Sequence, residues 1–275
     1  MRSVFLSTLC LAGLCVFSGS SPLKPLSAMQ PQEISTFLQS QHKSPFLKRL
    51  ELASAQALNT PYRLGPLGEG PGAPFDQKPL INFKEVDCVT FCEQSLALAL
   101  AKDHGQTVRI LQKIRYKNGQ IAMEKRNHYF MADWVPNNRW LVKDITATLP
   151  GHQWLNRTIS HRQLFASQNF TGIEALEDRD LKQAYLPTAR LQELPRFLQP
   201  GDIGVLIQSR PGIFAAHTGF FFRTASGDWV YRNATSIGPQ KVVDTPYADL
   251  MASLQRSKNL IGMALVRPHT SPKAP

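Results

Sequence analysis

The stretch Asn82-Phe-Lys-Glu-Val-Asp-Cys-Val-Thr-Phe91 places a cysteine, Cys88, where strand-forming residues give way to a helical run. That run extends from Val89 to Ala101, and Asp87, directly before the sulfur, is a residue type that caps helix N-termini. The unpaired N–H groups and the dipole of a helix N-terminus favour thiolate over thiol. Taken alone, the pattern is equally compatible with a reactive Cys88 and with a packing one.

Two residues far downstream complete a pattern with this cysteine. His217 lies in the strand-like run Ala215-Ala-His-Thr-Gly-Phe-Phe-Phe222, and Asn233 follows it. Cysteine, then histidine, then asparagine, well separated in sequence, is the order of a papain-like nucleophile site. The alternatives are a core histidine bonded to backbone and an ordinary turn asparagine. We therefore predict Cys88, His217 and Asn233 as the catalytic set.

The N-terminus predicts export. It has a charged start, an apolar run too short to span a bilayer, and small residues suited to signal-peptidase cleavage. We expect a signal peptide over residues 1–20, a linker over 21–32 and a single domain over 33–275. A lipid anchor on Cys10 or Cys15 is the alternative, but a leucine precedes each where a small residue is expected. No other segment is long and apolar enough to cross a membrane.

The charge and the remaining cysteine narrow the function classes. The formal net charge is +11, with Lys and Arg scattered along the chain, so we expect anionic partners. The export signal and the lack of a binding motif argue against nucleic acid, and an anionic envelope polymer fits better. Cys92 shares one predicted helix with Cys88, where a disulfide is unfavourable, so Cys92 is assigned to core packing. The sequence does not specify an oligomeric state.

The pattern along the chain predicts an α+β fold. Helical periodicity covers residues 31–59 with a break near Pro45, and a Gly- and Pro-rich loop follows. A strand over 108–116 is expected to form a hairpin through Asn118-Gly119 with residues 121–123. Within a helical or irregular insertion over 151–198, residues 179–184 are expected to form a helix. Further strands are expected at 203–208, 217–223, 229–232, 241–243 and 260–266. A helix carrying the cysteine would thus pack on an antiparallel sheet carrying the histidine.

Four motifs carry a resemblance to a known family. They are Thr60-Pro-Tyr62, Val86-Asp-Cys-Val-Thr-Phe-Cys-Glu93, Arg126-Asn-His-Tyr-Phe-Met-Ala-Asp-Trp134, and Gly201-Asp-Ile-Gly204 followed by His217-Thr-Gly-Phe220. In this order they resemble the N-acetylmuramoyl-L-alanine amidase-like family (DUF1460), a branch of the NlpC-type peptidoglycan hydrolases. The resemblance implies a papain-like fold and hydrolysis of the amide between N-acetylmuramic acid and L-alanine in peptidoglycan or muropeptides.

The resemblance also implies roles for individual residues. It makes Cys88 the nucleophile and His217 the base, while Asn233 stands where many relatives carry a histidine that orients the base. Tyr62 is expected to add a hydroxyl to the oxyanion site, or else to cap the core. Asp87 is expected to read a substrate charge, or else only to cap the helix.

A substrate-recognition wall is expected on the segment from Asn127 to Trp134. Its members are Asn127, His128, Tyr129, Asp133 and Trp134. Aromatic faces there would pack on a sugar ring and polar neighbours would bind hydroxyl and acetamido groups; packing alone is the alternative.

Two other functions stay open. Endopeptidase relatives, which cut the stem peptide between D-glutamate and the next residue, usually carry serine directly after the cysteine, whereas this chain has Val89. A non-catalytic peptidoglycan-binding relative is the other alternative. No metal-ligand spacing and no phosphate-binding glycine motif occurs in the sequence, so we expect neither a metal nor another cofactor.

Overall fold

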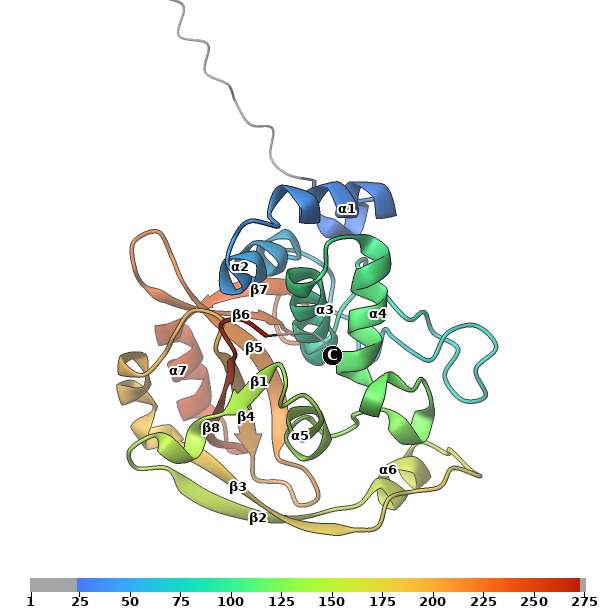
Figure 1. Ribbon diagram of the computed structural model, residues 1–275. Coiled ribbons are helices and arrows are strands. Elements are labelled where there is room, and N and C mark those ends of the chain that lie inside the picture. The colour runs from blue at the N-terminus through green and yellow to red at the C-terminus, as the bar shows by residue number, and fades with distance from the viewer. Residues whose placement is uncertain (1–23, 273–275) are drawn as a thin grey trace, which may run out of the picture.

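The computed structural model describes residues 24–272 (Figure 1). The signal peptide predicted over residues 1–20 lies outside the described residues. Part of the predicted linker does not behave as a linker: Leu26 is 2% exposed, and helix α1 already begins at Pro31. Leu26 therefore packs in the core and Met29 packs against it, whereas Lys24, Pro25 and Gln30 between and around them are exposed.

The helices are α1 (Pro31–Ser40), α2 (Phe46–Gln56), α3 (Cys88–Leu100), α4 (His104–Arg115), α5 (Val135–Asn137), α6 (His161–Ser167) and α7 (Tyr247–Arg256). The strands are β1 (Val142–Asp144), β2 (Gln153–Ile159), β3 (Arg179–Pro187), β4 (Ile203–Gln208), β5 (Ala215–Arg223), β6 (Trp229–Ala234), β7 (Val242–Pro246) and β8 (Leu260–Pro268). Between them lie short 3-10 helices and one π-helix, η4 (Phe130–Trp134).

The strands form one 8-stranded sheet in the order β2-β3-β8-β4-β5-β6-β7, with β1 paired to β8. Every pairing between these strands is antiparallel. Together with the helices this is the α+β class that the sequence predicts.

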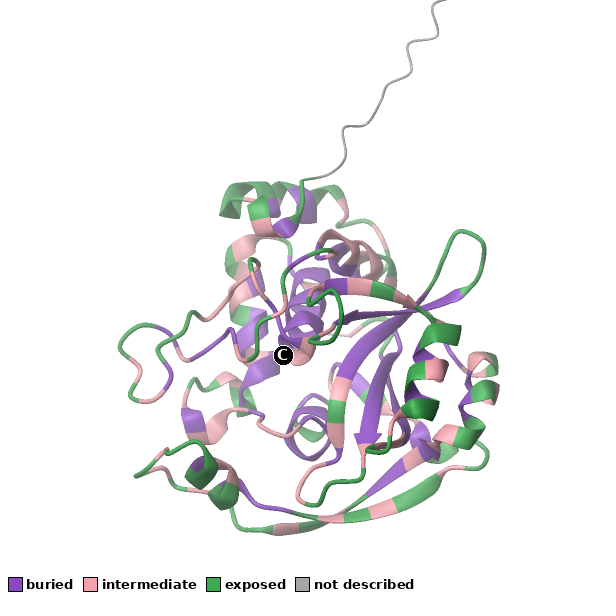
Figure 2. Cartoon of the chain, turned by 180° about the vertical axis from the view of Figure 1, so that it is seen from behind, coloured by how far each residue is buried: buried purple, intermediate pink, exposed green. Residues whose placement is uncertain are grey.

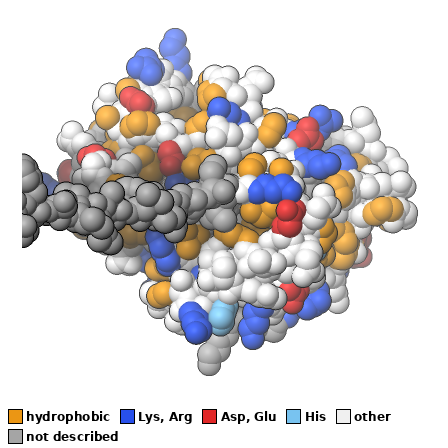
Figure 3. All heavy atoms as spheres, turned by 90° about the horizontal axis from the view of Figure 1, so that it is seen from above, with side chains coloured by type: hydrophobic (Ala, Val, Ile, Leu, Met, Phe, Trp, Pro, Cys, Tyr) orange, Lys and Arg blue, Asp and Glu red, His pale blue; other side chains and the backbone are white. Residues whose placement is uncertain are grey.

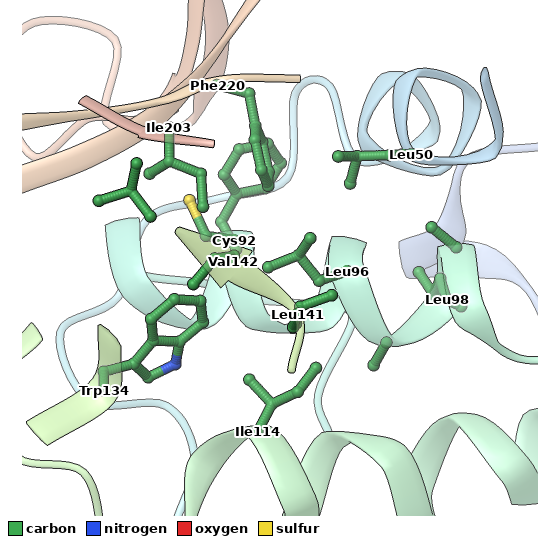
Figure 4. Packing of buried hydrophobic residues seen from close by; sticks show 14 of the residues in the cluster. Leu50, Cys92, Leu96, Leu98, Ile114, Trp134, Leu141, Val142, Ile203 and Phe220 are labelled. Carbon is green, nitrogen blue, oxygen red and sulfur yellow. The ribbon is translucent and has the colours of Figure 1, made fainter. Parts of the chain in front are cut away.

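Side chains alternate between the two faces of the sheet, and each face packs in a different hydrophobic cluster. Ile203 and Phe220 belong to the cluster beneath α1 to α4, whereas Leu206 and Phe221 belong to the cluster beneath α7. Figure 4 shows Cys92 of α3 among these side chains, next to Ile203 and Phe220. Cys92 is 0% exposed, which agrees with the packing role predicted for it.

Helix α3 is the central element of the larger core. Its residues from Thr90 to Ala99 are all buried, and Figure 2 shows the helix and the middle of the sheet in the buried colour. A helix that is buried on every side is enclosed by other elements. It therefore holds its first residue, Cys88, in a fixed position against the sheet.

Several predicted elements are confirmed. The helical region breaks at Pro45, which precedes the first residue of α2. Helix α3 begins at Cys88, and the five strands predicted after residue 200 are present as β4, β5, β6, β7 and β8.

The elements predicted over residues 108–123 are wrong. The strand expected over 108–116 is instead helix α4, because Ile110, Leu111 and Ile114 form one buried helical face. Asp103 caps this helix by accepting a hydrogen bond from the Gln106 N–H at 2.7 Å. The expected hairpin is reduced to a 3-10 turn through Asn118, with a single bridge between residues 116 and 126.

The helix expected over 179–184 is part of strand β3. Residues 179–185 pair with β2, from Arg179 opposite Ile159 to Tyr185 opposite Gln153. The β2–β3 pair extends the sheet along the bottom of Figure 1. Its partner strand lies at a distance in sequence, so the local pattern alone did not reveal it.

Candidate active site

Asp87 fixes the start of the helix that carries Cys88. Its Oδ1 accepts hydrogen bonds from the Thr90 N–H at 2.7 Å and from the Thr90 hydroxyl at 2.8 Å. Its Oδ2 accepts from the Gly65 N–H at 2.9 Å, which ties the Gly- and Pro-rich loop to the helix. Both carboxylate oxygens are occupied by protein donors, so the capping role fits Asp87 better than reading a substrate charge.

Strand β5 brings His217 to the same place. The hydroxyl of Thr218 donates to the carbonyl oxygen of Cys88 at 2.9 Å, so the strand is attached to the first residue of α3. Cys88 and His217, neither fully buried, line one pocket of about 150 Å³ together with Val89. Sequence reasoning quoted Thr218 within a motif but assigned it no role.

Asn233 orients the imidazole of His217. The side-chain N–H₂ of Asn233 donates to the carbonyl of Tyr231 at 2.9 Å and to the hydroxyl of Thr245 at 3.1 Å. This leaves Oδ1 as an acceptor, and it lies 2.9 Å from Nε2 of His217. Nε2 therefore carries the proton in the neutral ring, and Nδ1 is left with the lone pair that a general base needs.

Glycine is required where β5 packs beside Asn233. A Cβ added to Gly219 would lie 2.7 Å from the carbonyl oxygen of Arg232 and 2.7 Å from Cβ of Asn233. The glycine in the His-Thr-Gly motif thus permits the close approach of β6 that brings Asn233 beside His217.

The protonation of the pair differs from the expectation for a helix N-terminus. Burial raises the pKa of the Cys88 thiol to about 12, and the neighbouring Asp87 charge adds to this increase. Burial lowers the pKa of His217 below its ordinary value. In the free protein the neutral thiol and neutral imidazole are therefore favoured, so burial outweighs the helix dipole.

Tyr62 lies beside the cysteine. Its backbone forms a parallel bridge with Val86, and its N–H donates to the carbonyl of Gln240 at 2.8 Å. Burial raises the pKa of Tyr62, and the nearby Cys88 and Asp87 raise it further. The neutral form of the phenol is therefore favoured near the sulfur, although Tyr62 is not among the side chains that line the pocket.

The predicted recognition wall is only partly present at the pocket. His128 and Tyr129 line it together with Ala215 and His217, which come from a later segment of the chain. Burial lowers the pKa of His128 to about 4, and its Nε2 bonds the carbonyl of Met123 at 2.8 Å. The Tyr129 hydroxyl donates to the carbonyl of Ser160 at 3.0 Å.

The other three predicted wall residues face the protein interior. Asn127 donates to the carbonyl of Ile114 and accepts from Asn137. Asp133 accepts from the Tyr129 N–H, and its carboxylate pairs with His161 and Arg179. None of the three lines the pocket at Cys88, and the contacts of all three are with other protein groups.

Trp134 shows the physical reason most clearly. It is 0% exposed, stacks on Phe130 with 4.6 Å between ring centroids, and donates from Nε1 to Glu93 at 3.0 Å. An indole with both its face and its N–H occupied by protein belongs to the core.

Sequence reasoning also missed several residues of the pocket. Met131, Ala132, Phe214 and Ala215 line it beside Cys88. Three of them, Met131, Ala132 and Ala215, stand inside the runs quoted above, but as apolar residues they could not be distinguished there from core residues.

No group of three or more His, Cys, Asp or Glu side chains within residues 24–272 is arranged to hold a metal ion. In the same part of the chain no helix is long and apolar enough to cross a bilayer. Lys and Arg side chains are dispersed over the face seen in Figure 3.

Comparison with known families places the chain. The model of the AmiA-like family, described as N-acetylmuramoyl-L-alanine amidase-like, matches residues 52–258. The chain belongs to this family. Among curated proteins, no match was found.

Solved structures with the same fold carry related descriptions. A DUF1460 protein of Legionella pneumophila is similar at 25% identity and a TM-score of 0.77, covering 86% of this chain and 94% of its own. An N-acetylmuramoyl-L-alanine amidase of Bacteroides uniformis is 25% identical with a TM-score of 0.65, covering 81% of this chain and 98% of its own. A structure described as a putative xylanase of Bacteroides fragilis is 27% identical with a TM-score of 0.58, covering 78% of this chain and 99% of its own.

Proposed function

We propose that this protein is a cysteine-dependent N-acetylmuramoyl-L-alanine amidase with a papain-like catalytic arrangement. The observation that carries the proposal is the shared pocket of Cys88 and His217, in which Asn233 holds the imidazole with Nδ1 unprotonated. Membership of the amidase-like family supports the bond that we assign.

The chemistry follows from these groups. The Cys88 sulfur attacks the lactyl carbonyl of the muramic acid while Nδ1 of His217 takes the thiol proton. In this proposal the N–H of Cys88, which has no partner within the helix at the start of α3, and the Tyr62 hydroxyl donate to the developing oxyanion. The C–N bond then breaks, and His217 returns its proton to the leaving amine of L-alanine.

A water molecule completes the cycle. His217, again neutral, takes a proton from the water as its oxygen attacks the thioester. The C–S bond breaks, the free lactyl carboxyl is released, and the thiol of Cys88 is restored. Because the neutral thiol–imidazole pair is favoured at rest, proton transfer accompanies the attack rather than preceding it.

We further propose that the protein acts outside the cytoplasm, on peptidoglycan or its fragments. The N-terminal signal pattern supports removal of residues 1–20, and the domain over 33–275 would carry the activity.

The test is digestion of purified muropeptides, with products identified by mass spectrometry. The wild type is expected to release intact stem peptides beginning with L-alanine, and Cys88→Ala to release none. Cys92→Ala is the matched control: the side chain lies one helical turn along the same helix and packs in the core, so we expect activity to persist with a stability loss of about 1 kcal/mol.

Other outcomes separate the alternative functions. Cleavage inside the stem would identify an endopeptidase. Equal behaviour of the wild type and Cys88→Ala on every muropeptide would contradict the enzyme proposal, and retained binding without turnover would then identify a peptidoglycan-binding relative.

A further inference from the structure

A second, larger cavity lies beside the cysteine pocket. It has a volume of about 690 Å³ and is enclosed by β3 on one side and by α5 and β1 on the other. Met131, Ala132 and Phe214 line both cavities, so three side chains form the boundary between them. A substrate held at Cys88 can therefore reach the larger cavity across a short boundary.

The cysteine pocket alone is too small for a muropeptide. Its volume is about 150 Å³, whereas sites for ligands of drug size measure about 300–1,000 Å³. Only the groups next to the scissile amide fit there, and the larger cavity has the volume for the rest of one substrate arm.

The cavity is lined with positive charge. Arg139, Lys143, Arg179 and Lys182 contribute cationic side chains to it. Asp144 is its only acidic lining residue, and its oxygens accept hydrogen bonds from Thr146 and from Gln183. Four Lys and Arg side chains thus face one carboxylate, so these groups together carry a formal charge of +3.

Two of these four cations contact other protein groups, and the other two are available for a ligand. Arg179 pairs with Asp133 at 2.5 Å, and the Lys182 ammonium lies 4.7 Å from the centre of the Trp154 ring. Arg139 and Lys143 are exposed and form no ion pair within residues 24–272.

The backbone around them is held in place. The ring of His269 bonds the carbonyl of Arg139 at 2.9 Å, and Lys143 lies on β1, which pairs with β8. The backbone positions from which the two side chains extend are therefore fixed at the cavity.

The charge decides which arm of the substrate fits. In a muramoyl peptide the lactyl carboxyl is consumed in the amide, so the sugar arm is neutral. The stem peptide carries free carboxylates, beginning at its second residue, roughly 7 Å beyond the scissile nitrogen in an extended chain. That distance lies outside the small pocket, and carboxylates are the groups that Arg and Lys bind.

We propose that this cavity, through Arg139 and Lys143, binds the carboxylate-bearing stem peptide while the amide lies at Cys88. The assignment of substrate rests on the proposed amidase function, but binding can be measured without turnover. Phe214 belongs to the segment that leads into His217, the group that protonates the leaving peptide amine, so the cavity adjoins the side where that peptide departs.

The experiment measures binding of the free stem tripeptide, L-Ala-γ-D-Glu-diaminopimelate, to the Cys88→Ala protein by calorimetry. Adding Arg139→Glu and Lys143→Glu is expected to weaken binding about tenfold or more, since two attractive pairs become repulsive. Lys43→Glu with Lys102→Glu is the matched control, because both lysines are exposed and neither lines the cavity. The control should bind as the parent does.

Two further measurements test whether charge is what binds the stem peptide. If the Glu variants do not fold, Arg139→Gln with Lys143→Gln removes the charge without reversing it and should weaken binding several-fold. Converting the stem carboxylates to amides should weaken binding to the parent protein and abolish the difference between parent and variant. Equal affinities of cavity variant and control, or tight binding of the sugar arm in place of the stem, would overturn the inference. Failure of the wild type to cleave any muropeptide would instead contradict the amidase proposal.

Discussion

Replacing Asn233 by alanine tests how the base is oriented. The change removes the acceptor that lies 2.9 Å from Nε2 of His217, in a partly buried site. A desolvated donor left without a partner costs about 1–3 kcal/mol. The imidazole can then rotate, or move its proton to Nδ1, and in either state it cannot accept the proton of Cys88.

The cost falls on both rate and stability. If 1–3 kcal/mol is lost from the transition state, kcat/KM for a muropeptide should fall about 5- to 150-fold. The bonds from the Asn233 amide to Tyr231 and Thr245 are lost as well, so the free energy of unfolding should fall by about 1–3 kcal/mol.

The assay combines steady-state release of stem peptide with urea unfolding of the same samples. Thr245→Val is the control, because it removes one bond from the Asn233 amide but leaves Oδ1 and the bond to Tyr231 in place. We expect it to stay within a few-fold of wild type. A folded Asn233→Ala protein with kcat/KM within threefold of wild type would refute the assignment of Asn233.

Three other predictions follow from the same geometry. In Asn233→Asp, a carboxylate lies beside His217 and should raise the pKa of the imidazole. The base is then protonated at higher pH, so the acid limb of the kcat/KM profile should shift to higher pH. An unshifted limb would show that residue 233 does not contact the base. Thr218→Val removes the hydrogen bond to the Cys88 carbonyl. We expect kcat to fall more than KM rises, and the free energy of unfolding in urea to fall by about 1–2 kcal/mol. An unchanged kcat would show that the bond is structural only. Because burial raises the pKa of Cys88, iodoacetamide should label it more slowly than a free thiol at neutral pH and faster as pH rises; rapid labelling in mild acid would demonstrate a thiolate–imidazolium pair.

The slow labelling predicted for Cys88 is the opposite of what its place at a helix N-terminus suggests from the sequence alone. A helix N-terminus favours thiolate, but the depth at which the thiol is buried depends on how β5 packs against α3. That packing is a long-range property. Slow labelling of Cys88 is therefore compatible with catalysis and does not identify a binding protein.

Local signals were sufficient for the elements that carry the catalytic set. Asp87 caps α3 through contacts within its own turn, and β5 and β6 have runs of strand-forming residues around His217 and Asn233. The order of these residues along the chain therefore predicted their meeting in space. The residues 108–116 misled because β-branched residues there occupy one face of a helix whose cap, Asp103, lies further upstream.

The surroundings of the site needed the tertiary structure. Trp134 stands in an aromatic and polar segment, yet its stacking on Phe130 and its bond to Glu93 place it in the core. The cavity lined by Arg139 and Lys143 forms where β3 lies opposite α5 and β1, segments that are separated in sequence. Neither fact has a signature within a short stretch of sequence.

The central claim is that Cys88 cleaves the amide between muramic acid and L-alanine. Digestion of a defined muropeptide in ¹⁸O-labelled water tests it most directly, with both product fragments weighed by mass spectrometry. The account predicts one ¹⁸O atom in the lactyl carboxyl of the sugar fragment, an unlabelled stem with a free L-alanine amine, and neither product from Cys88→Ala. Label in a carboxyl of the stem peptide, or the same products from Cys88→Ala, would contradict it.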